Sequence, residues 1–391
     1  MIIEPKIRGF ICTTAHPEGC FENIRRQADY AKAHPVKGAR KALIIGASAG
    51  YGLASRICAA FGCGADTLGV IFDKPASGGR TASAGWYNTA AFERLAAKEG
   101  LYAATINGDA FSREVKEQAL ERIRRDMGKV DLVLYSLAAP RRTLPDGTVC
   151  SSVLKTVGEA YTNRTIDLKR RELAEVSISP ASEQEIADTV RVMGGEDWGD
   201  WIKALAEAGV LAENAITAAY SYIGPEMTHP IYMEGSIGRA KEDLYQTSRR
   251  IGESFPHLRA YISVNKALVT QSSSAIPIVP LYISILYRVM KQMGLHEGCI
   301  EQMSRLFNER LYAPNLLLDE RGCIRLDDWE MRPDVQAKVN EIWERIDNEN
   351  LEQLADIDGY WEDFYQMFGF HIPGVDYEKE ADPAVSIPSI G

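Results

Sequence analysis

Two tyrosine–lysine pairs in the sequence could move a proton to or from a substrate oxygen. Tyr287 and Lys291 are separated by three residues, and Tyr232 and Lys241 are separated by eight. A tyrosine hydroxyl can protonate or hydrogen-bond a developing oxyanion, and a nearby ammonium group lowers the free energy of the phenolate that remains. The residue types therefore predict acid catalysis at one of these two places.

The surroundings of the two pairs favour the second. Tyr287 ends a strongly apolar segment, which indicates packing, with Lys291 in solvent. Nine residues on a straight helix turn through about 900°, so Tyr232 and Lys241 would face opposite sides of one helix. We therefore expect Tyr232 in a loop ahead of the helix that carries Lys241, with Gly235 and Gly238 permitting the bend.

A glycine-rich turn provides a second candidate site. Gly46, Gly50 and Gly52 follow the apolar run 42–45 and precede the helical pattern 53–61. In a β-turn-α unit such glycines bring a pyrophosphate close to the helix N-terminus, where free N–H groups favour anions. The turn is predicted to bind a dinucleotide through Gly46, Ala47, Ser48, Ala49, Gly50, Tyr51 and Gly52.

The ends of the next strands predict how the rest of the dinucleotide is held. Asp73 lies 21 positions after Gly52, where an acidic side chain accepts hydrogen bonds from the adenosine ribose and repels a 2′-phosphate. This favours NADH over NADPH, although Lys74 and Arg80 nearby would favour the phosphate. The full set of expected contacts adds Phe72 beside Asp73, Asp109 and Ala110 near the adenine, and Leu137 and Ala138 along the middle of the cofactor.

Strands and helices must alternate to place these residues. The pattern predicts strands at 42–45, 67–72, 101–106, 130–136 and 259–264, and helices at 53–61, 89–99, 113–127, 182–193, 198–208 and 275–293. This alternation is typical of an α/β protein with a doubly wound parallel sheet, the Rossmann fold.

We expect one enlarged domain, because no linker divides the chain. Its expected parts are an N-terminal segment 1–40, a dinucleotide-binding half 41–140, an inserted hairpin or subdomain 141–192, a catalytic half 193–293 and a helical C-terminal extension 294–391.

Composition excludes several classes of protein. The chain has 391 residues, 46% of them hydrophobic, and a net charge of −10. An acidic chain lacks the basic surface that nucleic-acid binding requires. The most apolar segment, 275–290, contains Pro277, Pro280 and Arg288 and is too short to span a membrane. No signal peptide is recognisable at the start.

Seven cysteines, an odd number spread along the chain, fit free thiols in a reducing compartment, so a cytoplasmic protein is expected. Cys12, His16 and Cys20 have metal-type side chains but no fourth ligand, and we interpret them as packing residues. No metal site is predicted.

The sequence resembles the trans-2-enoyl-CoA reductase and V-type enoyl-acyl-carrier-protein reductase family, a branch of the short-chain dehydrogenase/reductase superfamily. The resemblance covers essentially the whole chain. It rests on the motifs at 8–12, 15–17, 46–52, 85–88, 108–111, 135–140, 192–198, 221–226 and 232–241.

The resemblance implies NADH-dependent reduction of the C2–C3 double bond of a trans-2-enoyl thioester, carried by coenzyme A or acyl carrier protein, in fatty acid metabolism. It implies Tyr232 as catalytic acid or enolate stabiliser, Lys241 as its electrostatic partner and a cofactor contact, and Tyr222 as a substrate contact. Leu268, Val269 and Thr270 would bind the nicotinamide end. No flavin is expected, because no second glycine turn appears, and a monomer is expected.

Two other functions remain open from the residues. A carbonyl reductase or alcohol dehydrogenase would use the same cofactor turn with either tyrosine–lysine pair on a C=O group. A non-enzymatic dinucleotide sensor would need the glycine turn alone.

Overall fold

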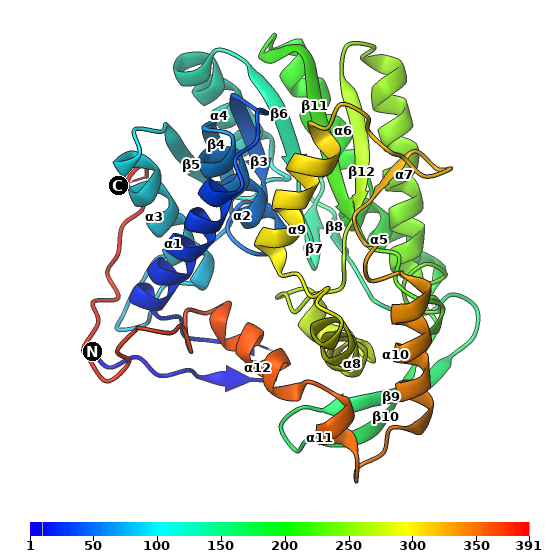
Figure 1. Cartoon of the computed structure of the whole chain (residues 1–391). Helices are drawn as coiled ribbons and strands as arrows, with labels where there is room; N and C mark the ends of the chain where they lie inside the picture. Colours follow the sequence, from blue (N-terminus) through cyan, green and yellow to red (C-terminus); the bar gives the residue numbers. More distant parts are fainter. Residues whose placement is uncertain (10, 391) are drawn as a thin grey trace.

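A seven-stranded parallel sheet forms the centre of the molecule in the computed structural model, which describes residues 1–9 and 11–390 (Figure 1). Its order is β13-β12-β11-β6-β3-β4-β5. The strands are β3 (Lys41–Ile45), β4 (Asp66–Ile71), β5 (Ala103–Asn107), β6 (Val130–Tyr135), β11 (Leu211–Ser221), β12 (Arg259–Val264) and β13 (Cys323–Arg325). The predicted doubly wound α/β fold is confirmed. Phe10, part of the motif at 8–12, lies outside the described residues.

The strand order reverses between β3 and β6, whose carboxyl ends lie side by side. Ile45 of β3 is in register with Tyr135 of β6, while β4 continues the sheet on the other side of β3. In such sheets the crevice at the reversal point is where ligands bind. The glycine turn, which follows β3, starts at this crevice.

Alternate side chains of each strand feed two separate cores. Ala42 and Ile44 of β3 pack into one, and Leu43 and Ile45 into the other. The first core contains α1 (Pro17–Ala33), α2 (Gly50–Ile57), α3 (Ala84–Lys98) and α9 (Cys299–Arg305), and the second contains α4 (Arg113–Arg122), α6 (Glu196–Glu207) and α7 (Ser236–Ser254). Burial on both faces explains why these strands are almost continuously apolar.

A further layer lies below the sheet in Figure 1. It contains α8 (Val279–Gln292), α10 (Pro333–Arg345), α11 (Leu351–Leu354), α12 (Ile357–Gln366) and the antiparallel hairpin of β9 (Tyr161–Asp167) and β10 (Glu172–Ile178). Smaller elements are the hairpin of β7 (Arg141–Thr143) and β8 (Val149–Ser151), the pair β1 (Ile7–Arg8) and β2 (Ile11–Cys12), and α5 (Glu183–Met193). Hairpins are thus present where the sequence predicts an insertion.

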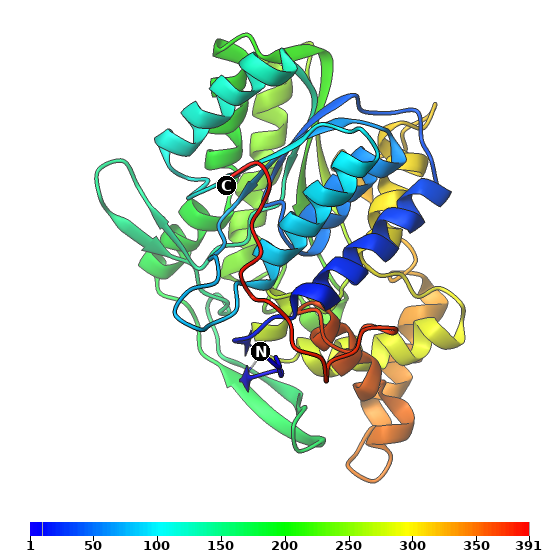
Figure 2. The ribbon, with the colours of Figure 1, turned by 90° about the vertical axis from the view of Figure 1, so that its left-hand side faces the viewer.

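The C-terminal segment covers the β5 edge of the sheet. It runs along α3 in Figure 2, where Trp86 donates from Nε1 to the Val385 carbonyl at 2.7 Å. Ser389 Oγ accepts a hydrogen bond from the backbone N–H of Thr105 in β5 at 2.9 Å, and Ser389 also bonds to the buried carboxylate of Glu93. An exposed edge strand is a template for unwanted pairing, and this tail covers it. No helix of the described residues has the length and apolarity that a bilayer crossing requires.

Candidate active site

The glycine turn joins β3 to α2 and leaves the first N–H groups of the helix available. Gly46 has φ +85° and Gly50 has φ +53°, a backbone conformation that favours glycine. Ala49, the N-cap residue just before α2, provides no side-chain acceptor for the N–H groups of the first turn. These groups can therefore bind an anion such as a pyrophosphate.

The three glycines have different roles. A Cβ on Gly52 would overlap the carbonyl oxygen of Gly46, and a Cβ on Gly46 would overlap that of Ser136. Both glycines are thus required for close packing of α2 on the sheet. A Cβ on Gly50 would meet nothing closer than Thr270 Cγ2 at 3.8 Å. The contact of Gly52 with the pyrophosphate stays a prediction, and of the three glycines only Gly50 would accept a Cβ without overlap.

Asp73 lies just beyond β4, as predicted, and is held at the start of α3. Ser83 Oγ donates to Asp73 Oδ1 at 2.7 Å, and the backbone N–H of Asp73 donates to Asn107 at 2.8 Å. Asp73 Oδ2 is enclosed and has no hydrogen-bond partner among the described residues. One carboxylate oxygen thus remains as a free acceptor. Phe72 beside it is 80% exposed.

The other predicted cofactor contacts follow β5 and β6. Asp109 accepts a hydrogen bond from the Phe111 N–H at 3.0 Å, and Ala110 is buried with its carbonyl bonded to Trp201 at 3.1 Å. Leu137 is half-buried and Ala138 is exposed directly after β6. All of these residues lie at the carboxyl edge of the sheet, on the same side as the glycine turn.

Tyr232 precedes α7 and Lys241 lies on it, as the spacing predicts. The first residue of α7 is Ser236, so Tyr232 lies in the turn before the helix and Lys241 in its second turn. A Cβ on Gly238 would overlap the carbonyl oxygens of Tyr232 and Met233. Glycine here lets the turn fold back against the helix, which confirms the predicted bend.

The Lys241 ammonium is held by the sheet. Its Nζ donates to the carbonyl oxygen of Tyr220 in β11 at 3.1 Å. Burial lowers the pKa of Lys241 to about 8, because the charged form loses hydration. Lys241 therefore changes protonation state close to neutral pH.

Tyr232 and Tyr222 form an aromatic pair beyond the carboxyl end of β11. Their ring centroids are 4.7 Å apart at an interplanar angle of 77°, an edge-to-face contact. Burial, together with the carboxylate of Glu330, raises the pKa of both Tyr232 and Tyr222. Both hydroxyls are consequently protonated, and able to donate, across the neutral range.

The segment 268–270 lies against the glycine turn. Gly50 faces Thr270, and Tyr51 of the turn donates from Oη to the Lys266 carbonyl at 2.6 Å. Leu268 and Val269 are buried. The structure thus brings together the turn and the segment expected at the nicotinamide end.

The second pair, Tyr287 and Lys291, has structural contacts only. Tyr287 is fully buried on α8, where its hydroxyl donates to Asp363 at 2.6 Å and accepts from the Val269 N–H at 3.1 Å. Lys291 is paired with Asp356 at 2.7 Å. The interpretation of Tyr287 as a packing residue is supported, and its hydroxyl also fixes the 268–270 segment.

Sequence reasoning missed the residues that support these tyrosines. Glu330 is fully buried and bonds to Tyr222, and Lys266 is 2% exposed beneath the same region. In the sequence Glu330 ends the run Asp-Asp-Trp-Glu, which is typical of a solvated surface. Nothing local distinguishes it, because its partners lie far away in the chain.

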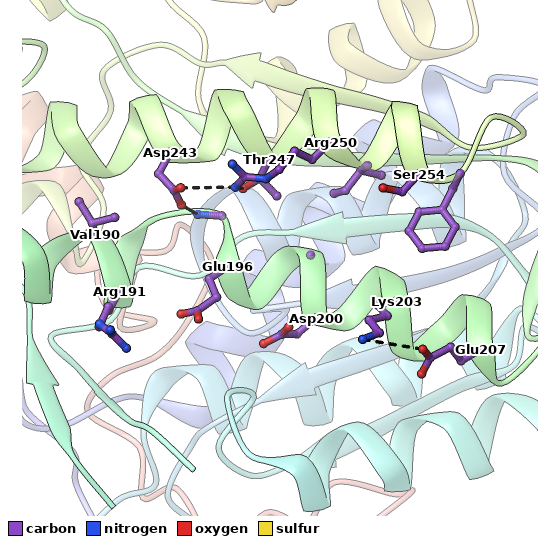
Figure 3. Close-up of a pocket in the computed structure, with 14 residues that line it drawn as sticks. Val190, Arg191, Glu196, Asp200, Lys203, Glu207, Asp243, Thr247, Arg250 and Ser254 are labelled. Atoms are coloured by element: carbon purple, nitrogen blue, oxygen red, sulfur yellow. Dashed lines mark hydrogen bonds and ion pairs between the residues drawn. The ribbon is translucent and has the colours of Figure 1, made fainter. Parts of the chain in front are cut away.

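A groove lies elsewhere on the molecule. It has a volume of about 740 Å³ between α5, α6 and α7, and Figure 3 shows Asp243 paired with Arg250 along α7 and Lys203 paired with Glu207 along α6. None of the predicted site residues lines it. Its acids and bases are of mixed sign, and Asp243 already accepts from the Gly195 N–H at 2.8 Å. The groove is separate from the tyrosine pair.

The cysteine–histidine cluster is used in packing. His16 precedes α1 and accepts a hydrogen bond from the Gly19 N–H through Nδ1 at 3.2 Å, while Cys12 donates to the Thr14 carbonyl. Across the part of the chain that the structure describes, no three His, Cys, Asp or Glu side chains are grouped to hold a metal ion.

These features together define a nicotinamide-dependent reductase with a Rossmann fold: the parallel sheet, the glycine turn and the tyrosine–lysine pair. Three family descriptions match successive parts of the chain. They are "NAD(P)H binding domain of trans-2-enoyl-CoA reductase" at residues 2–78, "Trans-2-enoyl-CoA reductase catalytic region" at 80–312 and "Enoyl reductase FAD binding domain" at 318–381. The chain belongs to the trans-2-enoyl-CoA reductase family.

Full-length relatives agree with this assignment. The chain is 53% identical to the trans-2-enoyl-CoA reductase [NADH] of Ruminiclostridium cellulolyticum, with 100% of each chain covered. It is 57% identical to the enoyl-[acyl-carrier-protein] reductase [NADH] of Coxiella burnetii, covering 100% of this chain and 98% of the relative.

Solved structures show the same fold. A Clostridium acetobutulicum trans-2-enoyl-CoA reductase in complex with NADH has a TM-score of 0.96 at 44% identity, with 98% of each chain covered. A Treponema denticola trans-2-enoyl-CoA reductase in complex with NAD has a TM-score of 0.95 at 48% identity, covering 97% of this chain and 98% of that one. The predicted family, enzyme class and nicotinamide cofactor are confirmed.

The family description at 318–381 names FAD, so this segment would have to provide residues that bind a dinucleotide. A dinucleotide turn requires glycines between a strand and a helix. After β13 the described chain continues as Leu-Asp-Asp-Trp-Glu-Met-Arg, without glycine, until α10 begins at Pro333. The buried carboxylate of this stretch, Glu330, is bonded within the chain. These residues do not form a dinucleotide turn.

The different roles of Gly50 and Gly52 can be tested by alanine substitution. Gly52→Ala should lower the melting temperature strongly, because overpacking against a backbone carbonyl costs about 1–3 kcal/mol or more. Gly50→Ala should keep the fold, at a cost of about 1–2 kcal/mol for its positive φ, and weaken NADH binding at least ~10-fold by filling the anion site. Thermal unfolding and NADH fluorescence titration measure both effects. Wild-type NADH affinity in Gly50→Ala would contradict the assignment.

Proposed function

We propose that this chain reduces the C2–C3 double bond of trans-2-enoyl thioesters with NADH, as a step of fatty acid metabolism. The observation that carries the proposal is the Tyr222–Tyr232 pair, which lies beyond the carboxyl end of β11, with Lys241 on the adjoining helix. A ketone reductase and an enoyl reductase both need such a donor. The full-length identity to enoyl reductases supports the second.

The residues proposed to hold the cofactor lie along the carboxyl edge of the sheet. The pyrophosphate would contact the turn Gly46–Gly52 through backbone N–H groups, with Gly50 providing the approach. The Asp73 carboxylate would accept from the adenosine ribose, beside Phe72. Asp109, Ala110, Leu137, Ala138, Lys241, Leu268, Val269 and Thr270 complete the proposed contacts.

Tyr232 is the proposed catalytic acid. NADH, when bound, would supply a hydride for C3 of the enoyl thioester, negative charge would develop on the thioester oxygen, and a proton would then reach C2 to give the saturated thioester. Tyr232 Oη donates a hydrogen bond to that oxygen, because its raised pKa keeps it protonated. A donor placed where charge develops stabilises the transition state more than the ground state. Tyr222 would contact the substrate next to it.

Lys241 is proposed to support this step by its charge. Its ammonium contacts the Tyr220 carbonyl and leaves two further N–H donors for the ribose at the nicotinamide end. A cation at this place also stabilises the negative charge that builds up on the substrate oxygen. No metal ion or flavin takes part in the proposed reaction.

The proposed substrates are enoyl thioesters of coenzyme A or of acyl carrier protein, since relatives of similar identity are named for each. We also propose that the chain acts as one unit and as a monomer. The proposal of one unit is supported by a hydrophobic core that includes residues from Ile3 to Ile387. A cytoplasmic location is proposed because the cysteines are free thiols.

The activity test is NADH oxidation with crotonyl-CoA against a panel of ketones and aldehydes. Turnover should occur with crotonyl-CoA and yield butyryl-CoA, with NADPH a poorer donor than NADH because of Asp73. Turnover with ketones alone would refute the proposal. NADH binding without any turnover would favour a sensor.

Tyr232→Phe separates the chemistry from the fold. It should lower kcat by roughly 10²–10⁴-fold with NADH affinity nearly unchanged, because the ring and its contact with Tyr222 remain. The comparison is Tyr287→Phe, which leaves Asp363 and the Val269 N–H without a partner and should chiefly lower the melting temperature. If Tyr287→Phe abolishes turnover and Tyr232→Phe does not, the assignment is wrong.

The pKa of Lys241 predicts an alkaline limb. Its value of about 8 in the folded chain means that the ammonium is present below this pH and lost as the pH rises through it. We therefore expect kcat/KM for NADH to fall above about pH 8. Lys241→Arg, whose guanidinium keeps its charge, should move this limb to higher pH, while Lys241→Met should be impaired at every pH. A profile that is flat to pH 10 would exclude this role.

A further inference from the structure

Glu330 has a fully buried carboxylate that is bonded by three donors. Its Oε1 accepts from Tyr222 Oη at 3.1 Å and from Tyr282 Oη at 2.7 Å. Its Oε2 accepts from the backbone N–H of Ala267 at 2.7 Å. A buried carboxylate needs these donors, because the loss of any one of them would leave part of its negative charge without a hydrogen bond.

Two of the donors and the acceptor come from loops that lie next to one another. Tyr222 follows β11, Ala267 follows β12 and Glu330 itself follows β13, and these strands are neighbours in the sheet. Their carboxyl ends therefore meet at one edge. Glu330 connects the three loops at that edge, and Tyr282 adds α8 to the group.

Two of these donors belong to opposite sides of the proposed reaction centre. Tyr222 lies edge-on to Tyr232, the proposed acid. Ala267 immediately precedes the 268–270 segment, which is proposed to hold the nicotinamide end. One carboxylate is thus hydrogen-bonded to both of these segments.

We propose that Glu330 is a positioning residue, which holds Tyr222, and through it Tyr232, in register with the 268–270 segment. This inference rests on the proposed function. It gives residues 318–381 a part in the reaction centre, through a protein carboxylate rather than a second cofactor. A displacement of about 1 Å between reacting groups can cost up to ~10²-fold in rate, so such a residue affects kcat without contacting substrate.

The charges around Glu330 agree with this role. Burial raises the pKa of Glu330, and the Lys266 ammonium opposes that rise. Lys266 donates to the Ala267 carbonyl at 3.0 Å and also experiences the charges of Glu297 and Asp363. Asp327 is a further acid within electrostatic range of Glu330. The Glu330 carboxylate in turn raises the pKa of Tyr222 and Tyr232, which preserves them as donors.

The test compares two tyrosines that donate to the same oxygen. Glu330→Gln and Tyr222→Phe should each lower kcat with crotonyl-CoA about 10-fold or more, with KM for NADH within about 3-fold of wild type. Tyr282→Phe also removes one hydrogen bond to Oε1, but Tyr282 lies on α8 and is not part of the Tyr222–Tyr232 aromatic pair. It should change kcat by less than about 3-fold.

A double-mutant cycle gives the decisive measurement. In the Tyr222→Phe background, Glu330→Gln should cost clearly less in kcat than it does in the wild type, because the bond through which it acts is already gone. Equal costs in both backgrounds, or an unchanged kcat in Glu330→Gln, would overturn the inference. Melting curves establish that each variant is folded at the assay temperature, and Glu330→Asp replaces Glu330→Gln if the latter is not. Failure of wild-type enzyme to reduce crotonyl-CoA would instead refute the proposed function.

Discussion

The hydrogen bonds to the Glu330 carboxylate are the interaction on which the site depends. A charged group without access to water must find all its donors within the protein. Here they come from the loops after β11 and β12 and from α8, and the acceptor comes from the loop after β13. These segments are far apart in the chain, so the bonds form only when the sheet and the layer below it are both complete. The site and the tertiary fold are therefore formed together.

The first half of the fold could be predicted because its signals are local. Apolar runs, helical periodicity and the glycine turn identify β3, β4, β5 and β6 to within a few residues. β11 was not predicted, although it lies in the middle of the sheet. Its sequence, Leu-Ala-Glu-Asn-Ala-Ile-Thr-Ala-Ala-Tyr-Ser, is rich in alanine and has Glu213 and Asn214 near its start, so its β propensity is low. Pairing with β6 and β12 on both sides determines its conformation.

The candidate site shows the same division between local and distant information. The placement of Tyr232 ahead of α7 followed from helix geometry and two glycines. The tight contact of Gly52 with the carbonyl of Gly46 did not follow from the spacing of the glycines in the sequence. Asp73 could be placed at the end of β4. Its hydrogen bond to Ser83, ten positions later at the start of α3, depends on the conformation of the loop between them. Glu330 had no sequence signal at all.

Function here requires cations in places that disfavour them. Lys241 and Lys266 both have a pKa lowered to about 8 by burial, so the protonated form of each is held at a cost in folding free energy. The negative charges of Glu330, Glu297 and Asp363 offset the cost of burying the Lys266 ammonium. Among the described residues, the hydrogen-bond partner of the Lys241 ammonium is the Tyr220 carbonyl. An uncompensated cation with free N–H donors can still bind a ligand, and a compensated one cannot do so without losing a partner. This difference distinguishes the two lysines by role. In the proposed site, Lys241 contacts cofactor and substrate, and Lys266 stabilises the carboxylate that is proposed to position the tyrosines.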